Sequence, residues 1–154
     1  MKKAREQIAA LPLRWNDKDK VEVLMITSRD TGRWLVPKGW TMKDVKPWAA
    51  AAIEALEEAG AKGHIGREVF GTYSYDKRLD DGTKQPCRVR VYPMIVDRLK
   101  SNWKEKDQRV RRWFSLKEAA KRVDEPELAE MLQRLHVKPK KHPVAGPMLR
   151  RAAS

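Results

Sequence analysis

Short runs of hydrophobic residues, several of them alternating with polar ones, recur along the chain and predict β-strands. The runs that predict strands are 21–27, 34–36, 69–75, 88–96 and 111–114. Turn-forming residues at 29–32 end the first run, and Pro37 ends the second. The turn-rich stretch 80–83 separates two of the alternating runs, which predicts a β-hairpin between them.

Three other segments carry helix signals. A helix is predicted from about Val45 to Ala59, because Pro47 suits a first turn and Gly60 stands where a C-terminal glycine belongs. Ser115 to Glu118 has the form of a capping box, and Pro126 begins a helix that runs to about residue 136. Strands and helices mixed in this order predict an α/β sandwich with a mixed sheet.

After the last predicted helix the chain becomes basic and is interrupted by prolines. Lys138-Pro139-Lys140-Lys141 begins this segment, and Arg150 and Arg151 lie near its end. We therefore expect a folded domain over 1–136, followed by a mobile basic tail over 137–154.

The composition narrows the class of protein. At 154 residues, with 41% hydrophobic and 36% charged residues, the chain is long enough for a hydrophobic core and is unlike a disordered chain. Its apolar runs are too short to span a bilayer, and no apolar segment follows the basic N-terminus as a secretory signal would require. The single cysteine, Cys87, excludes an internal disulfide and fits a reducing compartment. These features predict a cytoplasmic protein without a membrane span.

The net charge of +13 indicates an anionic partner. Nucleic acid, a membrane surface and a highly phosphorylated small molecule all meet this requirement. A basic surface that serves only solubility is the alternative, and charge alone does not decide between them.

Three glutamates lie on one face of the first predicted helix. Glu54, Glu57 and Glu58 have the spacing i, i+3, i+4, and they lie near the helix C-terminus, where the macrodipole disfavours negative charge. Such a cluster favours a compensating hard cation with oxygen ligands, Mg²⁺ first. A solvated glutamate face is the alternative interpretation of these three residues.

The surrounding residues extend this pattern. Residues 39–61 resemble the Nudix box, G-x5-E-x7-R-E-U-x-E-E-x-G-U, where U is a bulky apolar residue, and the residues that match in register are Gly39, Glu54, Glu57, Glu58 and Gly60. The resemblance implies a Nudix α/β/α sandwich and metal-dependent hydrolysis of phosphoanhydride bonds, with Mg²⁺, or alternatively Mn²⁺. It makes Glu54, Glu58 and the Gly39 carbonyl metal ligands. It also makes Glu57 a ligand or the base that orients water, so that catalysis depends on Glu57 and Glu54.

Two positions depart from the box. Val45 replaces its first glutamate and Ile53 replaces its arginine, so both members of a supporting charged pair are absent. An apolar pair can replace an ion pair without loss of stability, and we expect Val45 and Ile53 to pack together. The loss of supporting groups also leaves open a weakened or silent catalytic site.

Flanking segments resemble one branch of the family. Residues 28–39 are similar to the S-R-x-x-x-R-W-x-x-P-x-G approach of the diphosphoinositol polyphosphate phosphohydrolases, and Trp103 with 108–114 is similar to their W…R-x-x-x-W-F segment. The resemblance implies a diphosphoinositol polyphosphate or a dinucleoside polyphosphate as substrate. The expected substrate-binding residues are Arg29, Lys38 and Arg109, with Arg14, Arg88 and Arg90 as weaker candidates.

Two other functions remain open at this point. An RNA 5′-pyrophosphohydrolase would use the basic tail, but we recognise no RNA-binding motif and do not favour a nucleic-acid partner. A catalytically weakened Nudix module that binds nucleotides or RNA is the second alternative, motivated by Val45 and Ile53. The intact glutamates favour an enzyme.

Overall fold

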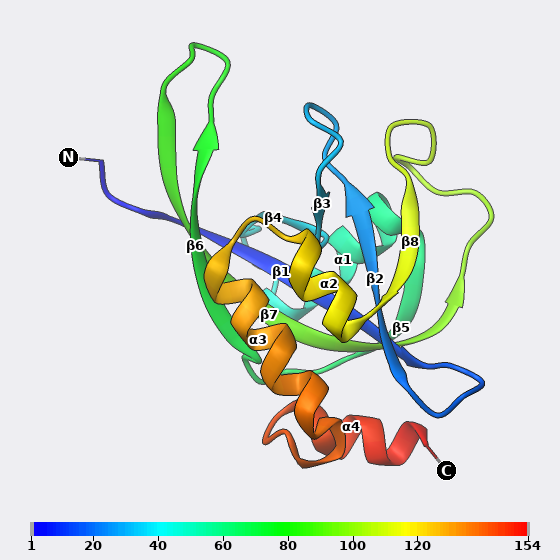
Figure 1. Ribbon diagram of the computed structural model, residues 1–154. Coiled ribbons are helices and arrows are strands. Elements are labelled where there is room, and N and C mark those ends of the chain that lie inside the picture. The colour runs from blue at the N-terminus through cyan, green and yellow to red at the C-terminus, as the bar shows by residue number, and fades with distance from the viewer. Residues whose placement is uncertain (1, 154) are drawn as a thin grey trace.

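A central sheet with helices on both faces forms the molecule (Figure 1). The computed structural model describes residues 2–153. The strands are β1 (Arg5–Trp15), β2 (Val21–Thr27), β3 (Trp34–Leu35), β4 (Lys38–Trp40), β5 (Ala61–Ile65), β6 (Gly71–Arg78), β7 (Lys84–Leu99) and β8 (Arg111–Ser115). The helices are α1 (Pro47–Ala59), α2 (Leu116–Arg122), α3 (Pro126–Val137), the 3₁₀ turn η1 (Pro139–Lys141) and α4 (Ala145–Ala152).

The sheet is mixed, as predicted. Its main path is β3-β2-β1-β7-β5, with β4 added to β1, β6 to β7 and β8 to β2. Strands β1 and β7 run parallel along Arg5 to Leu13, whereas the other pairings are antiparallel. Of the described helices, none is long and apolar enough to cross a membrane.

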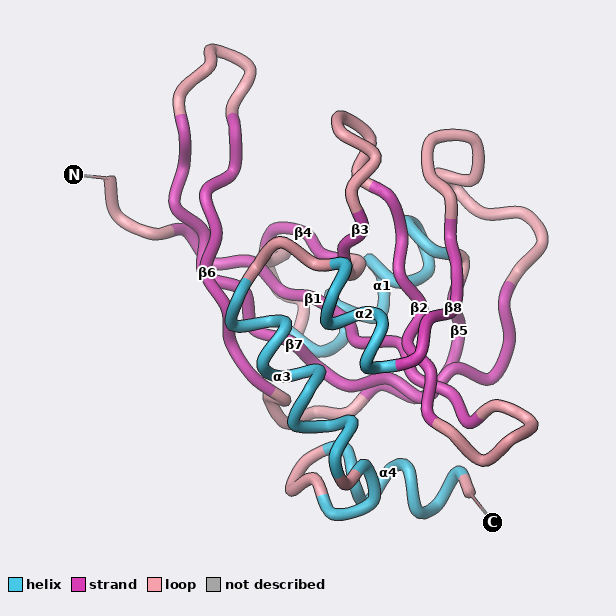
Figure 2. The backbone as a smooth tube through the Cα atoms, viewed as in Figure 1, coloured by secondary structure: helices cyan, strands magenta, loops and turns pink. Residues whose placement is uncertain are grey.

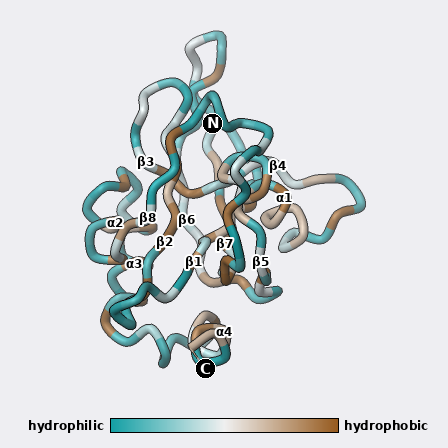
Figure 3. The backbone as a smooth tube through the Cα atoms, turned by 90° about the vertical axis from the view of Figure 1, so that its right-hand side faces the viewer, coloured by the Kyte–Doolittle hydropathy of each residue, from teal (hydrophilic) through white to brown (hydrophobic). Residues whose placement is uncertain are grey.

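Two hydrophobic clusters, one on each face of the sheet, hold the layers together. The first packs α1 against the sheet through its alanines, with Ala50, Ala51 and Ala55 fully buried beside Ile8 and Ile26. The second packs α2, α3 and α4 against the opposite face. Hydrophobic residues follow the middle of the strands, whereas the projecting loops are mostly hydrophilic (Figure 3). The expected α/β/α sandwich is confirmed.

The sequence patterns located most of these elements but missed β1, β4, β5 and α4. Strand β1 lies in the middle of the sheet, and its residues 7–13 are buried without alternation, because both faces of the strand are covered. Pro12 lies between the part of β1 paired with β4 and the part paired with β2, so its missing N–H falls where the strand changes neighbours.

The C-terminal segment is folded, and the expectation of a mobile tail after residue 136 is wrong. Its helix α4 buries Ala145, Met148 and Leu149, and two of these join the cluster beneath α3. The Trp15 indole N–H also donates to the Leu149 carbonyl at 2.9 Å. Basic residues dominate this segment, but its few apolar residues fall on one face of a helix and are buried together.

Three connections project from one end of the sheet (Figure 2). They are the β6–β7 hairpin, the β2–β3 loop over 28–33 and the loop over 100–110 that precedes β8. The candidate active site lies at this end.

Candidate active site

The C-terminus of α1 is fixed by the loop over 100–110. Gly60 adopts the left-handed conformation, φ 65°, and a Cβ there would lie 2.8 Å from the Trp103 ring. The Trp103 indole N–H donates to the Glu58 carbonyl at 3.2 Å, and Arg111 Nη1 donates to the Ala59 carbonyl at 2.9 Å. The positive charge of Arg111 also complements the negative end of the α1 helix dipole. This cap holds the last turn of α1, and therefore its glutamates, in place.

Strand β4 lies directly against two of those glutamates. Gly39 pairs with Ile8 of β1, and an ideal Cβ at Gly39 would lie 2.5 Å from the Glu54 carboxyl carbon. The Lys38 backbone N–H donates to Glu58 Oε1 at 3.2 Å. The absence of a side chain at Gly39 therefore leaves room for the Glu54 carboxylate in its present position beside the backbone of β4.

Burial and mutual repulsion perturb these carboxyl groups. Burial, followed by the charge of Glu58, raises the pKa of Glu54 to about 8. Burial also raises the pKa of Glu58, an effect that Arg109 opposes. Burial lowers the pKa of Lys38 to about 8, which the neighbouring Glu58 partly counteracts. Glu54 and Glu58 therefore resist carrying two negative charges unless a cation accompanies them.

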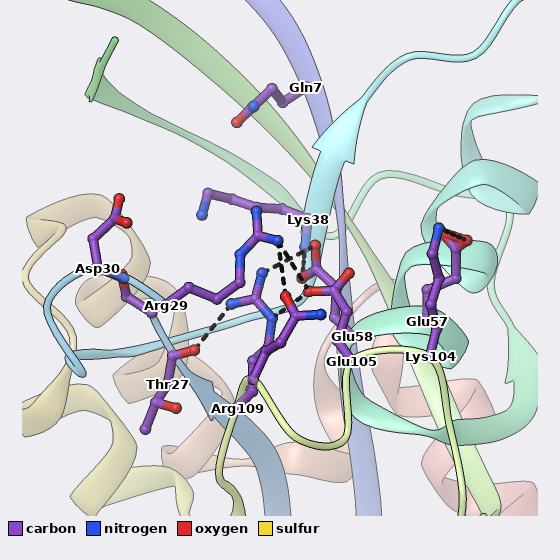
Figure 4. Close-up of polar contacts among 12 residues, drawn as sticks. Gln7, Thr27, Arg29, Asp30, Lys38, Glu57, Glu58, Lys104, Glu105 and Arg109 are labelled. Carbon is purple, nitrogen blue, oxygen red and sulfur yellow. Dashed lines mark hydrogen bonds and ion pairs between the residues drawn. The ribbon is translucent and has the colours of Figure 1, made fainter. Parts of the chain in front are cut away.

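Arg109 connects the glutamates to the projecting loops. Its side chain is only 8% exposed, and its Nη2 lies 3.6 Å from Glu58 Oε2. Its Nε donates to Glu105 Oε1 at 2.8 Å and its Nη1 to the Thr27 carbonyl at 2.9 Å. Arg29 reaches the same loop and donates to Gln108 Oε1 at 3.1 Å. Figure 4 shows Arg29, Arg109, Glu58 and Glu105 converging on one another.

The third glutamate lies apart from this cluster. Glu57 points toward Lys104, with 3.4 Å between Nζ and Oε2, and the pair lies to one side of the other residues in Figure 4. Within residues 2–153, no three acidic, histidine or cysteine side chains are arranged to hold a metal ion. The structure thus brings together Glu54, Glu58 and Gly39 but not Glu57.

A cleft of about 300 Å³ opens over the paired carboxylates. Its lining residues are Gln7, Ser28, Arg29, Asp30, Leu35, Lys38, Gly39, Trp40, Glu54, Glu58, Tyr75, Lys77 and Arg109. Lys38 Nζ lies 5.0 Å from the Tyr75 ring centre, and the Tyr75 hydroxyl donates to Gln7 Oε1 at 2.7 Å. Arg5 stacks 4.1 Å over Trp40 at the rim. Carboxylates at the base and cations around them suit a ligand that combines a metal ion with phosphate groups.

Sequence reasoning placed Arg29, Lys38 and Arg109 near the glutamates, and all three line the cleft. Arg14, Arg88 and Arg90, which were also expected to bind the substrate, do not line it. Arg14 instead binds Glu22 at 2.8 Å and stacks on Trp113 at 4.1 Å. Arg88 and Arg90 do lie on one face of β7, as their spacing indicates, but β1 lies between β7 and β4 in the sheet.

Gln7, Tyr75 and Lys77 are among the lining residues that were missed. Gln7 belongs to β1, for which no signal was recognised. Tyr75 and Lys77 share one face of β6 by the period of two, and this alternation next to a predicted hairpin could have identified them.

The two substituted box positions do not share one environment. Val45 packs against the α1 cluster, whereas Ile53 is 37% exposed. The exposure of Ile53 argues against the expectation that Val45 and Ile53 form a buried apolar pair where the Nudix box has a charged pair.

Comparisons with known proteins agree with the box and the fold. A NUDIX domain model matches residues 5–135. Diphosphoinositol polyphosphate phosphohydrolase 2 of Rattus norvegicus is 33% identical over 135 residues, which cover 85% of this chain and 70% of the relative. Nudix hydrolase 16, mitochondrial, of Arabidopsis thaliana is 30% identical over 134 residues, which cover 79% of this chain and 74% of the relative.

Solved structures share the fold at lower identity. The C. elegans Ap4A hydrolase has a TM-score of 0.61 and 18% identity, with 88% of this chain and 98% of that chain covered. A Nudix hydrolase from Nitrosomonas europaea has a TM-score of 0.65 and 19% identity, with 88% and 90% covered. Because the family model spans most of the chain and the box residues Gly39, Glu54 and Glu58 meet at one cleft, the chain belongs to the Nudix family and is a hydrolase of pyrophosphate bonds.

Proposed function

We propose that this cleft hydrolyses a phosphoanhydride bond of a polyphosphorylated small molecule with the help of Mg²⁺. The observation that carries the proposal is the buried pair of Glu54 and Glu58, packed against Gly39 and surrounded by cationic side chains. Ionising both carboxylates together is costly because their charges repel each other. A divalent cation bound beside them would offset this cost and stabilise the doubly ionised pair.

The residues present fit a magnesium ion. Carboxylate and backbone carbonyl oxygens are its preferred protein ligands, so Glu54, Glu58 and the Gly39 carbonyl would hold it. When bound there, Mg²⁺ would neutralise phosphate charge and favour deprotonation of a water molecule. Glu57 would complete the ligand set or act as the base, and either role requires that it release Lys104.

The chain's own side chains divide the remaining tasks. Arg109 holds Glu58 by charge and is itself held by Glu105 and Thr27, so it sets the position of the carboxylate. Lys38 and Arg29 would bind the phosphates that do not react. In the role of base, Glu57 would accept the proton of the attacking water while the new oxygen–phosphorus bond forms and the bridging phosphoanhydride bond breaks, with the bridging oxygen leaving on the departing phosphate.

The cationic rim favours a substrate with many phosphate groups. Lys38, Lys77, Arg29 and Arg109 all line the cleft, so a highly charged ligand meets several cations at once. Diphosphoinositol polyphosphates are named for several relatives, and a dinucleoside polyphosphate for one structural neighbour. We propose these two classes as substrates.

A turnover panel tests the proposal. Inorganic phosphate and nucleotide products would be measured with and without Mg²⁺ for a diphosphoinositol polyphosphate, Ap5A, Ap6A and triphosphorylated RNA. The proposal predicts Mg²⁺-dependent turnover of one of the first three. Turnover of RNA alone would indicate a 5′-pyrophosphohydrolase, whereas tight binding without any turnover would indicate a silent module.

A further inference from the structure

A second cleft lies far from the carboxylates. Its volume is about 980 Å³, more than three times that of the active-site cleft, and it is bounded by the β1–β2 turn, α2, the end of α3, η1 and the end of α4. Trp15 lines it, whereas Gln7, eight residues earlier on β1, lines the active site. At about 3.3 Å per residue, β1 separates the two clefts by roughly 26 Å.

The walls of this second cleft are strongly basic. The lysines that line it are Lys20, Lys117, Lys138, Lys140 and Lys141, and Asp19 is the one acidic residue in the lining. Within residues 2–153, none of these lysines forms an ion pair with a carboxylate. Five positive charges without acidic partners in one concave surface attract a ligand with several negative charges.

The cleft also presents apolar and aromatic groups. Trp15 is oriented by its hydrogen bond to the Leu149 carbonyl, and Lys140 Nζ lies 5.5 Å from its ring centre. Val137 is 72% exposed at the same cleft. A ligand made only of phosphate would leave these surfaces unused, so the complementary ligand combines anions with planar, partly apolar groups.

The segment that carries three of the lysines is held in place. His142 Nδ1 accepts from the N–H groups of Val144 and Ala145, both at 3.1 Å. The side chain of Arg150 donates to the Lys140 carbonyl. The lysines on η1 therefore lie on an ordered surface, which lowers the entropy lost when a ligand binds.

We propose that this cleft binds a short single-stranded segment of nucleic acid. Phosphates would contact the lysines while a base packs against Trp15 and Val137, the combination of contacts typical of single-strand binding. A flat membrane surface fits less well, because the apolar groups lie within a concave site. The two clefts share no lining residue, so a ligand can occupy this one without contacting the active-site residues.

Fluorescence anisotropy with a labelled 5′-hydroxyl RNA 12-mer tests the proposal. This probe carries no phosphoanhydride bond and is therefore not a substrate for the proposed reaction. The test variant carries Lys138→Glu, Lys140→Glu and Lys141→Glu. The matched control carries Lys43→Glu, Lys62→Glu and Lys100→Glu, three exposed positions outside both clefts that change the net charge equally.

We expect the cleft variant to bind RNA at least tenfold more weakly and the control within threefold of the wild type. The cleft variant lacks three lysines that would each neutralise a phosphate. The plot of log K against log salt concentration should therefore be less steep by about 2 for this variant, whereas the slope for the control should not change. Equal weakening in both variants would show a general charge effect and overturn the proposal. Competition by polyglutamate or by anionic vesicles as strong as by unlabelled RNA would overturn it as well, because neither presents bases.

Discussion

Replacing Gly39 by alanine tests the contact between β4 and the carboxylate of Glu54. The added Cβ would lie 2.5 Å from the carboxyl carbon, and the carboxylate must retreat by about 0.9 Å to reach an ordinary contact of 3.4 Å. The clash is with the end of a flexible side chain, and Gly39 does not need a positive φ. The substitution should therefore lower the free energy of unfolding only by the cost of an off-rotamer side chain, about 0.5–1.5 kcal/mol.

The effect on activity should be larger. A misplacement of about 1 Å in a catalytic group lowers the rate by about 10²-fold, which corresponds to about 2.7 kcal/mol of transition-state stabilisation. We expect kcat/KM of Gly39→Ala, measured at saturating Mg²⁺, to fall by about that factor while the thermal unfolding midpoint changes little.

A double-mutant cycle locates the effect. In a Glu54→Gln background the same alanine should cost less than threefold, because the carboxylate that it displaces is already absent. If Gly39→Ala retained wild-type kcat/KM, or cost 10²-fold in both backgrounds, the placement of Glu54 by Gly39 would be refuted.

Three further predictions concern stability, pH and metal affinity. Leu149→Ala should lower the free energy of unfolding by about 2–5 kcal/mol in urea titrations, since Leu149 is fully buried; a loss below 0.5 kcal/mol would mean that α4 does not pack as described. Without Mg²⁺, Glu54 keeps its proton to a higher pH in the folded state, so the stability linked to this proton is complete below about pH 4.5, decreases above it and is lost as the pH rises through about 8; the melting midpoint should therefore fall between pH 5 and 8, and Glu54→Gln should flatten this fall. Lys104→Ala frees Glu57 and should raise Mg²⁺ affinity in calorimetric titrations; unchanged affinity would exclude Glu57 from the ligand set.

The sequence predicted the elements whose periodicity is regular and local. The β2 strand, the β6–β7 hairpin and the capping box at Ser115 follow the expected patterns, and Ser115 Oγ accepts from the Glu118 N–H at 3.1 Å. Strand β1 escaped prediction because burial of both faces removes alternation and because Pro12 resembles a strand terminator. Gly63 similarly obscured β5, where the pairing with β7 shifts register.

The candidate site was predicted where the box fixes spacing along one helix. Glu54 and Glu58 meet at Gly39, but Glu57 turns to Lys104, a contact across 47 positions that helical spacing cannot indicate. Gln7 and Arg5 reach the cleft only through the long-range pairing of β1 with β4. Arg88 and Arg90 were assigned from strand alternation, which identifies a face of the strand but not the strands beside it, and neither residue lines the cleft.

The most direct test compares Mg²⁺-dependent hydrolysis of a diphosphoinositol polyphosphate and of Ap6A by the wild type and by Glu58→Gln. Glutamine preserves the acceptor for the Lys38 N–H and removes the charge that would hold the metal ion. We predict Mg²⁺-dependent turnover of one of these substrates by the wild type and at least a 100-fold lower kcat/KM in the variant, with unchanged unfolding. Equal kcat/KM in the two proteins, or no turnover of either substrate by the wild type, would contradict the assignment of this cleft as a magnesium-dependent active site.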